Sequence, residues 1–168
     1  MKTKIFLAAP FYSYMNDSKV RMCEQRIQQI SSLLKFLRSK NFEVHNAHER
    51  EEWGSNWYTP EACTTLDFET IRSSDLLIAI PGNPASGGVH IELGWASALG
   101  KSVILLLDKA YTYSSLVEGL KQITSVKYIR YDEFNEITGE LTKFLDINRV
   151  PNLQSHNSSI KVTEKQAV

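Results

Sequence analysis

Five short apolar runs, separated by longer amphipathic segments, constrain the fold of this chain more than any other feature. The runs are residues 5–9, 42–45, 75–80, 103–107 and 126–130. Helical periodicity is clearest over residues 18–40, where apolar side chains recur every three or four positions. Buried strands that alternate with such helices favour a parallel sheet covered on both faces. The sequence therefore predicts an α/β fold, a three-layer sandwich around a five-stranded parallel sheet.

The remaining segments complete this pattern. Further helices are predicted over residues 59–73, after residue 86, over 114–122 and over 133–146. Residues 1–148 are expected to form one domain, and the polar, aperiodic residues 149–168 a disordered tail. The connection over residues 46–58 is longer than a usual strand-to-helix connection, which suggests a functional loop.

Charge and composition limit the partners of this chain. Nineteen basic and nineteen acidic residues give a formal net charge of zero, so no nucleic-acid-binding surface is expected. The first apolar run is too short for a signal peptide, and no segment reaches membrane-spanning length. Cys23 and Cys63 fit reduced thiols rather than a disulfide framework. We therefore expect a cytoplasmic protein that does not bind membranes.

The stretch Ser86-Gly87-Gly88-Val89-His90-Ile91-Glu92-Leu93-Gly94 is the richest in chemical information. It predicts a glycine-rich turn after the third strand, followed by a helix with a carboxylate in its first turn. Such a turn presents backbone N–H groups and the positive end of the helix to a ligand. In an open α/β sheet this place is the crevice at the carboxyl ends of the strands. A phosphate bound at Ser86, Gly87 and Gly88 would suit it.

Two acidic residues, Asp67 and Glu92, are placed to project toward the same end of the sheet. A pair of carboxylates is the usual equipment for breaking a glycosidic bond. The helix N-terminus is expected to favour the ionised form of Glu92, which suits a nucleophile. The alternative is that Glu92 only complements the helix dipole and that Asp67 is a solvated helix residue.

Other sites were weighed against this one. The chain has no Walker loop, no dinucleotide fingerprint and no G-x-S-x-G elbow. His45 and His48, near Glu49, Glu51 and Glu52, raise a metal hypothesis, but they lack the helical His-Glu-x-x-His pattern, and no metal site is predicted. His90 either contacts a substrate or caps its helix.

Aromatic residues gather near the predicted crevice, which suits a nucleobase slot or the ordinary packing of loops. They are Phe11, Tyr12, Tyr14, Trp53, Trp57 and Tyr58.

Several of these segments together resemble the nucleoside 2-deoxyribosyltransferase superfamily. The resemblance covers roughly residues 4–147, and its most specific part is the Glu92-Leu93-Gly94 helix. The segments that carry it are 6–11, Asp67, 74–79, 86–96 and 100–103. It implies a flavodoxin-like fold and cleavage of the N-glycosidic bond of nucleosides or nucleotides. It also implies that Glu92 is the nucleophile and that Asp67 orients the substrate and assists proton transfer to the base.

Within the superfamily, the chain is closest to the hydrolases of nucleoside 5′-monophosphates, the cytidylate and deoxynucleoside monophosphate glycosidases. Those hydrolases hold the phosphate with a serine six residues before the catalytic glutamate, the spacing of Ser86 from Glu92. Residues 113–119, with Ser114 and Ser115, look like their second phosphate element, which a neighbouring subunit delivers. The resemblance thus implies a homo-oligomer, a dimer or larger, with a shared active site.

The first strand departs from the mammalian-type hydrolases, which have a tyrosine there and a serine in the following turn. Phe6 and Pro10 occupy these places here, so the base and the 2′ substituent of the sugar stay open. Phe11 is a candidate for stacking on the base, and Arg21 for contacting base or phosphate, although either could be structural.

The leading hypothesis is a retaining N-glycosidase that hydrolyses a pyrimidine-type nucleoside 5′-monophosphate through a Glu92 glycosyl-enzyme, without a metal or organic cofactor. One alternative is a nucleoside 2-deoxyribosyltransferase, which passes the sugar to a second base. Another is a nucleotide-sensing module without catalysis. A flavodoxin-like electron carrier is disfavoured, because no Ser/Thr-rich phosphate loop follows the first strand.

Overall fold

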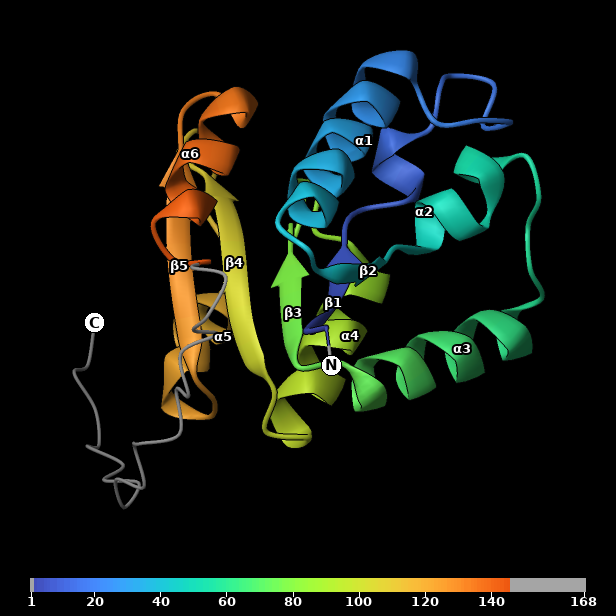
Figure 1. Ribbon diagram of the computed structural model, residues 1–168. Coiled ribbons are helices and arrows are strands. Elements are labelled where there is room, and N and C mark those ends of the chain that lie inside the picture. The colour runs from blue at the N-terminus through green and yellow to red at the C-terminus, as the bar shows by residue number, and fades with distance from the viewer. Residues whose placement is uncertain (1, 146–168) are drawn as a thin grey trace, which may run out of the picture.

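The computed structural model describes residues 2–145, which form a five-stranded sheet with helices on both faces (Figure 1). The strands are β1 (Lys4–Ala8), β2 (Glu43–His45), β3 (Leu76–Ala79), β4 (Ser102–Asp108) and β5 (Val126–Tyr131). The helices are α1 (Glu24–Ser39), α2 (Ala47–Arg50), α3 (Pro60–Ser73), α4 (Gly87–Ala98), α5 (Ser115–Glu118) and α6 (Ile137–Thr142). All paired strands are parallel, in the order β2-β1-β3-β4-β5. The predicted fold class is confirmed, and this order is that of flavodoxin-like folds.

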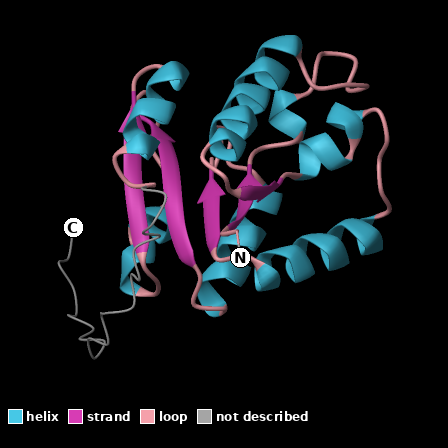
Figure 2. Cartoon of the chain, viewed as in Figure 1, coloured by secondary structure: helices cyan, strands magenta, loops and turns pink. Residues whose placement is uncertain are grey.

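Helices cover both faces of the sheet (Figure 2). A hydrophobic layer lies between the sheet and the helices on each face. Ile5 and Leu7 of β1 face the layer formed with α1 and α6, whereas Phe6 and Ala8 face the layer formed with α3, α4 and α5. This alternation follows from the period of two in an extended strand. Because both faces of the central strands are covered, residues 5–8, 76–79 and 103–107 are apolar without interruption, as the sequence pattern indicated. The polar residues Lys4, Ser102 and Asp108 lie at strand ends.

The helix predicted over residues 18–40 begins at Glu24. Residues before it form a short 3-10 turn, Tyr12–Tyr14, and a two-strand bridge between Met15 and Met22. Cys23, which precedes the helix, is extended, and Val20 is exposed rather than on the buried stripe. Val20 and Cys23 continue the three-and-four spacing of the apolar residues in α1 by coincidence, which is why the predicted helix began too early.

Three other segments differ from the prediction. The expected loop over residues 46–58 contains α2 and a 3-10 turn, Glu52–Gly54. The helix expected over 114–122 is a four-residue α5 followed by a 3-10 turn, Leu120–Gln122. The last helix starts with a 3-10 turn, Phe134–Glu136, before α6. The predicted tail, residues 149–168, lies outside the described residues.

None of the helices within residues 2–145 is long and apolar enough to cross a membrane.

His48 fastens α2 to the loop after β1 from the interior of the protein. Its ring is 1 % exposed, and its Nε2 lies 3.0 Å from the carbonyl oxygen of Pro10. Since that oxygen can only accept, Nε2 carries the proton, and Nδ1 accepts from the Asn46 amide at 3.2 Å. Burial lowers the pKa of His48 to about 4, although the bond to Pro10 opposes this shift.

We expect this histidine to make folding sensitive to mild acid. An unfolded His48 binds a proton below about pH 6.5, whereas the folded one stays neutral until about pH 4, so its contribution to stability is lost as pH falls through this window. Between pH 7 and pH 5, the wild type should lose about 2 kcal/mol of unfolding free energy relative to His48→Gln. Urea denaturation at the two pH values measures this difference. Equal pH dependence in the two proteins would contradict the neutral, buried state of His48.

Candidate active site

The candidate site lies where β1 and β3 end side by side. Ile5 pairs with Leu76 and Ala8 with Ala79, so the two strands end at the same level. β1 continues toward α1 on one face of the sheet, and β3 toward α4 on the other, which opens a crevice between the two connections. The two loops touch at Gly82, whose φ is +84°, because an added Cβ there would lie 2.6 Å from Pro10 Cγ. Glycine is therefore needed at this position for both space and conformation.

The N-terminus of α4 presents free backbone donors at this crevice. Ser86 is the N-cap, and its Oγ accepts from the Val89 amide at 3.5 Å. Gly87 and Gly88 are the first two helical residues, whose N–H groups have no partner within a helix. A Cβ on either glycine would meet nothing within 4 Å. Neither packing nor backbone conformation in this chain requires glycine here, so the open space is available to a ligand.

The predicted position of Glu92 in the first turn of this helix is wrong. Because α4 begins at Gly87, Glu92 is its sixth residue and belongs to the second turn. The field of the helix end falls off within the first turn, so burial dominates the ionisation of Glu92 instead. Burial, followed by the negative charge of Asp67, raises the pKa of Glu92 to about 8, and Arg50 opposes both effects. The expected ionised form is therefore the minor form of Glu92 at pH 7 in the free protein.

Asp67 is not a solvated helix residue, since its side chain is 13 % exposed. One Arg50 NH group donates to its Oδ1 at 2.6 Å, and His45 Nε2 lies 3.9 Å from the same oxygen. Asp67 lies on α3, and an edge-on contact between Phe68 and Trp95, 5.5 Å between ring centroids, joins this helix to α4. These neighbours place Asp67 and Glu92 side by side, near enough for the charge of one to shift the pKa of the other.

The sequence reading missed Arg50, the cation of this cluster. Its second NH group donates to Glu51 Oε1 at 2.6 Å, and Glu51 also accepts from the Cys63 thiol at 3.4 Å. Burial and this bond raise the pKa of Cys63 to about 11, so the thiol stays protonated. The sequence indicates its role only by placing Arg50 within the acidic run 49–52. That run was interpreted only in terms of metal binding.

His45 and His48 point to different places, which argues against a shared metal. His45 faces Asp67 and stacks on Phe6 at 5.2 Å, whereas His48 is bonded to Pro10. Within residues 2–145, no group of three or more His, Cys, Asp or Glu side chains is arranged to hold a metal ion.

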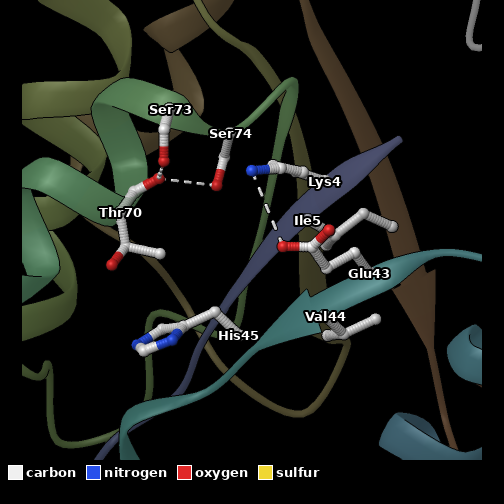
Figure 3. A pocket seen from close by; sticks show the side chains of 8 residues that line it. All are labelled: Lys4, Ile5, Glu43, Val44, His45, Thr70, Ser73 and Ser74. Atoms are coloured by element: carbon white, nitrogen blue, oxygen red, sulfur yellow. Dashed lines mark hydrogen bonds and ion pairs between the residues drawn. The ribbon is translucent and has the colours of Figure 1, made fainter. Parts of the chain in front are cut away.

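His45 also lines a cavity of about 340 Å³ between α3 and the strands β1 and β2 (Figure 3). The other walls are Lys4, Ile5, Glu43, Val44, Thr70, Ser73 and Ser74. Lys4 and Glu43 form an ion pair of 3.7 Å at one side, and the Ser73 and Ser74 hydroxyls donate to the Thr70 carbonyl. None of the residues predicted to bind substrate lines this cavity.

Phe11 lies within a row of aromatic rings that runs from His48 to Tyr12. It packs on His48 at 4.5 Å and on Trp57 at 4.6 Å, and Trp57 in turn lies 6.0 Å from Tyr12. The predicted aromatic cluster at the crevice thus contains Phe11, Tyr12 and Trp57. Arg21 is exposed, and its backbone is paired with Asn16. We call Arg50, Glu51, Asp67 and Glu92 the carboxylate cluster. The structure gives the Arg21 side chain no contact with it.

The His90 ring folds back on the start of its own helix, where its Nδ1 donates to the Ser86 carbonyl oxygen at 2.7 Å. That oxygen also accepts from the His90 amide, so this contact caps none of the free N–H groups of the helix, and contact with a substrate stays a prediction. Ser114 caps α5 in the same way that Ser86 caps α4, accepting from the Val117 amide at 3.4 Å. Ser114 and Ser115 follow β4, so they lie at the same edge of the sheet as Ser86. Next to them, Leu116 is 83 % exposed.

Solved structures similar to this chain include two at 36 % identity. A Clostridium botulinum CMP N-glycosidase, BcmB, matches with a TM-score of 0.65 over 83 % of this chain and 99 % of its own. BlsM matches with a TM-score of 0.72 over 83 % of this chain and 87 % of its own. A 2-deoxyribosyltransferase from Bacillus psychrosaccharolyticus, 22 % identical, shares the fold with a TM-score of 0.56 over 81 % and 90 % of the two chains.

No match was found among the curated proteins compared with the chain. The sequence profile of the nucleoside 2-deoxyribosyltransferases, an enzyme family, matches residues 5–154. This match spans nearly the whole sequence and includes every residue of the carboxylate cluster, so the chain belongs to the nucleoside 2-deoxyribosyltransferase family.

Proposed function

We propose that this protein is a retaining N-glycosidase that hydrolyses the base–sugar bond of a pyrimidine-type nucleoside 5′-monophosphate. The observation that carries the proposal is the pairing of the Asp67 and Glu92 carboxylates on the two helices beside the open N-terminus of α4. The likeness to a CMP N-glycosidase over 99 % of that chain supports the hydrolase rather than the transferase. The products are the free base and the ribose or deoxyribose 5-phosphate.

The phosphate binds at the start of α4. The amides of Gly87 and Gly88 donate to its oxygens, and the positive end of the helix favours its charge. Ser86 Oγ accepts only a long bond of 3.5 Å, and its own proton is free to be donated to the phosphate. With the phosphate at the first turn, the sugar lies over the second turn, where Glu92 is.

Glu92 keeps its proton in the resting enzyme up to about pH 8. When this proton moves from Glu92 to Asp67, a Glu92 oxygen attacks the anomeric carbon and the C–N bond electrons leave with the base. Asp67 then gives the proton to the departing base. Water attacks the glycosyl-enzyme next, loses a proton to Asp67 and releases ionised Glu92, which restores the resting pair.

A second copy of the chain completes the phosphate site in this proposal. Leu116 and Ile123, on the segment after Ser114, are 83 % and 66 % exposed, which is unusual for large apolar side chains. A partner that covers them brings its Ser114 or Ser115 hydroxyl to the phosphate. Ser114 Oγ, like Ser86 Oγ, only accepts a long bond from an amide of its own helix, so its proton is also free to be donated.

A mass-spectrometric assay of base release tests the substrate. We expect release from ribo- or deoxyribonucleoside 5′-monophosphates and little from the unphosphorylated nucleosides. Ser86→Ala should raise KM for the monophosphate about tenfold, because one hydrogen bond to a charged group is lost. Turnover of nucleosides alone, with formation of a new nucleoside when a second base is added, would show a transferase instead.

Glu92→Gln should abolish base release and also stabilise the fold at alkaline pH. The folded pKa of Glu92 is raised, so the folded state loses stability as pH rises from about 4.5 to about 8 and ionisation becomes costly. Glutamine carries no such cost, and the variant should gain about 5 kcal/mol at pH 9 but nothing at pH 4. Urea denaturation and the base-release assay measure the two effects.

The matched control is Glu61→Gln, an exposed glutamate in the first turn of α3. It should change neither activity nor the pH dependence of stability. Normal activity of Glu92→Gln would remove Glu92 from the mechanism.

Leu116→Glu tests the second copy. A charge in the covered surface should give a monomer in light scattering and reduce kcat/KM for the monophosphate at least about tenfold, since the partner hydroxyl is lost. Lys35→Glu, at an exposed position of α1 away from this surface, controls for charge alone. A wild-type protein that is monomeric and fully active would contradict the shared site.

A further inference from the structure

Arg50 bridges two buried carboxylates that belong to different elements. Its two NH groups bind Asp67 Oδ1 and Glu51 Oε1, each at 2.6 Å, and its side chain is 13 % exposed. Glu51 follows Arg50 directly, whereas Asp67 lies 17 residues further along the chain. A planar guanidinium that binds two carboxylates at once has little freedom to turn. Asp67 is thereby held from the side of α2.

The backbone that carries Arg50 is itself fixed to the sheet. Asn46 caps α2, since its Oδ1 accepts from the Glu49 amide at 3.1 Å. The amide of the same side chain donates to the Leu7 carbonyl of β1 at 3.0 Å. A chain of contacts therefore runs from β1 through Asn46 and Arg50 to Asp67, and it ends beside Glu92.

The Arg50 side chain is not oriented so that all its N–H groups form hydrogen bonds. Its Nε is buried and has no hydrogen-bond partner among residues 2–145. An arginine placed only to stabilise the fold is expected to pair all its buried donors. Here the guanidinium lies over the Tyr58 ring, 5.2 Å from its centroid, with both NH groups directed to the two carboxylates. The geometry favours Asp67 and Glu51 at the expense of Nε.

The charges around the Glu92 and Asp67 pair are few and come from four elements. β2 contributes His45, α2 and its end contribute Arg50 and Glu51, α3 contributes Asp67 and the Cys63 thiol, and α4 contributes Glu92. His48 lies deeper, and the low pKa given above keeps it neutral. Burial alone would lower the pKa of Arg50, but its bonds to Asp67 and Glu51 outweigh burial and raise it above its ordinary range. Arg50 therefore stays positively charged while the carboxylates titrate.

We propose that Arg50 is a positioning residue, which holds the Asp67 carboxylate beside Glu92 and places one fixed positive charge next to the pair. The proposal rests on the proposed glycosidase function for its kinetic consequence, but its structural part does not. Arg50 has two separable effects. Its forked shape orients Asp67 toward the reacting groups, and its charge sets the pH at which Glu92 loses its proton.

Two substitutions separate these effects. Arg50→Gln removes both the fork and the charge, whereas Arg50→Lys keeps a charge but cannot bind two carboxylates in a fixed plane. Arg38→Gln is the matched control, because Arg38 binds the α2 residue Glu49 through two NH groups but lies on the exposed side. Each protein is labelled with ¹³C at the glutamate δ-carbon, and the Glu92 signal, assigned by its loss in Glu92→Gln, is titrated by NMR. The pH profile of kcat/KM for base release is measured on the same proteins.

The wild type should show Glu92 titrating near pH 8 and activity falling above that pH. Arg50→Gln should move both curves to higher pH by about half a unit or more, and lower kcat about tenfold or more with a smaller change in KM. Arg50→Lys should leave the Glu92 titration near the wild-type value but keep most of the loss in kcat. Arg38→Gln should match the wild type in both measurements.

Two results would overturn the proposal. One is an unchanged Glu92 titration in Arg50→Gln, and the other is full kcat in Arg50→Lys. If Arg50→Gln does not fold, Arg50→Lys alone decides the role of the fork through kcat. If the wild type releases no base from any nucleotide, the proposed function fails, but the NMR titration still decides whether Arg50 controls the proton on Glu92.

Discussion

Burial of both faces of the central strands holds this molecule together and decides where its polar chemistry can lie. β1, β3 and β4 are covered by α1 and α6 on one side and by α3, α4 and α5 on the other. The covered side chains of these strands are therefore apolar. Polar groups therefore lie at the ends of the strands. Because the strands are parallel, all the loops that follow a strand leave the sheet at the same edge. The order β2-β1-β3 places the loops after β1 and β3 next to each other. The crevice is a consequence of this sheet rather than an addition to it.

At this crevice the fold tolerates an arrangement that weakens it. Two carboxylates on neighbouring helices repel each other where water cannot screen them, and one of them retains its proton into the neutral range. Arg50 compensates part of the repulsion but leaves its own Nε without a partner. Such local conflicts are expected at sites that are arranged for a reaction rather than for stability. In the proposed mechanism, this conflict keeps the proton on Glu92 available for transfer.

The sequence was sufficient for the fold but only partly for the site. The parallel sheet and its layers followed from the alternation of apolar runs and helices, whereas the strand order entered only through the flavodoxin-like fold that the resemblance implies. Asp67, Ser86 and Glu92 are predicted site residues, named from spacing and resemblance. The protonation of Glu92 was predicted wrongly because it depends on where α4 begins, and the two glycines open the helix instead of forming a turn before it. Arg50 escaped notice because its partners are joined only by tertiary packing, across 17 residues of sequence. Short elements such as α2 have too few residues to show a period.

Gly87 and Gly88 are positions at which folding and ligand binding favour different residues. A methyl group at either position would meet open space, and alanine is a better helix former than glycine, so folding alone would favour replacing them. In the proposed function, the phosphate that approaches the start of the helix is the reason for glycine at both positions. A descendant of this chain that kept its fold but lost its substrate would be free to fill these two positions, and side chains there would serve as a record of the lost activity.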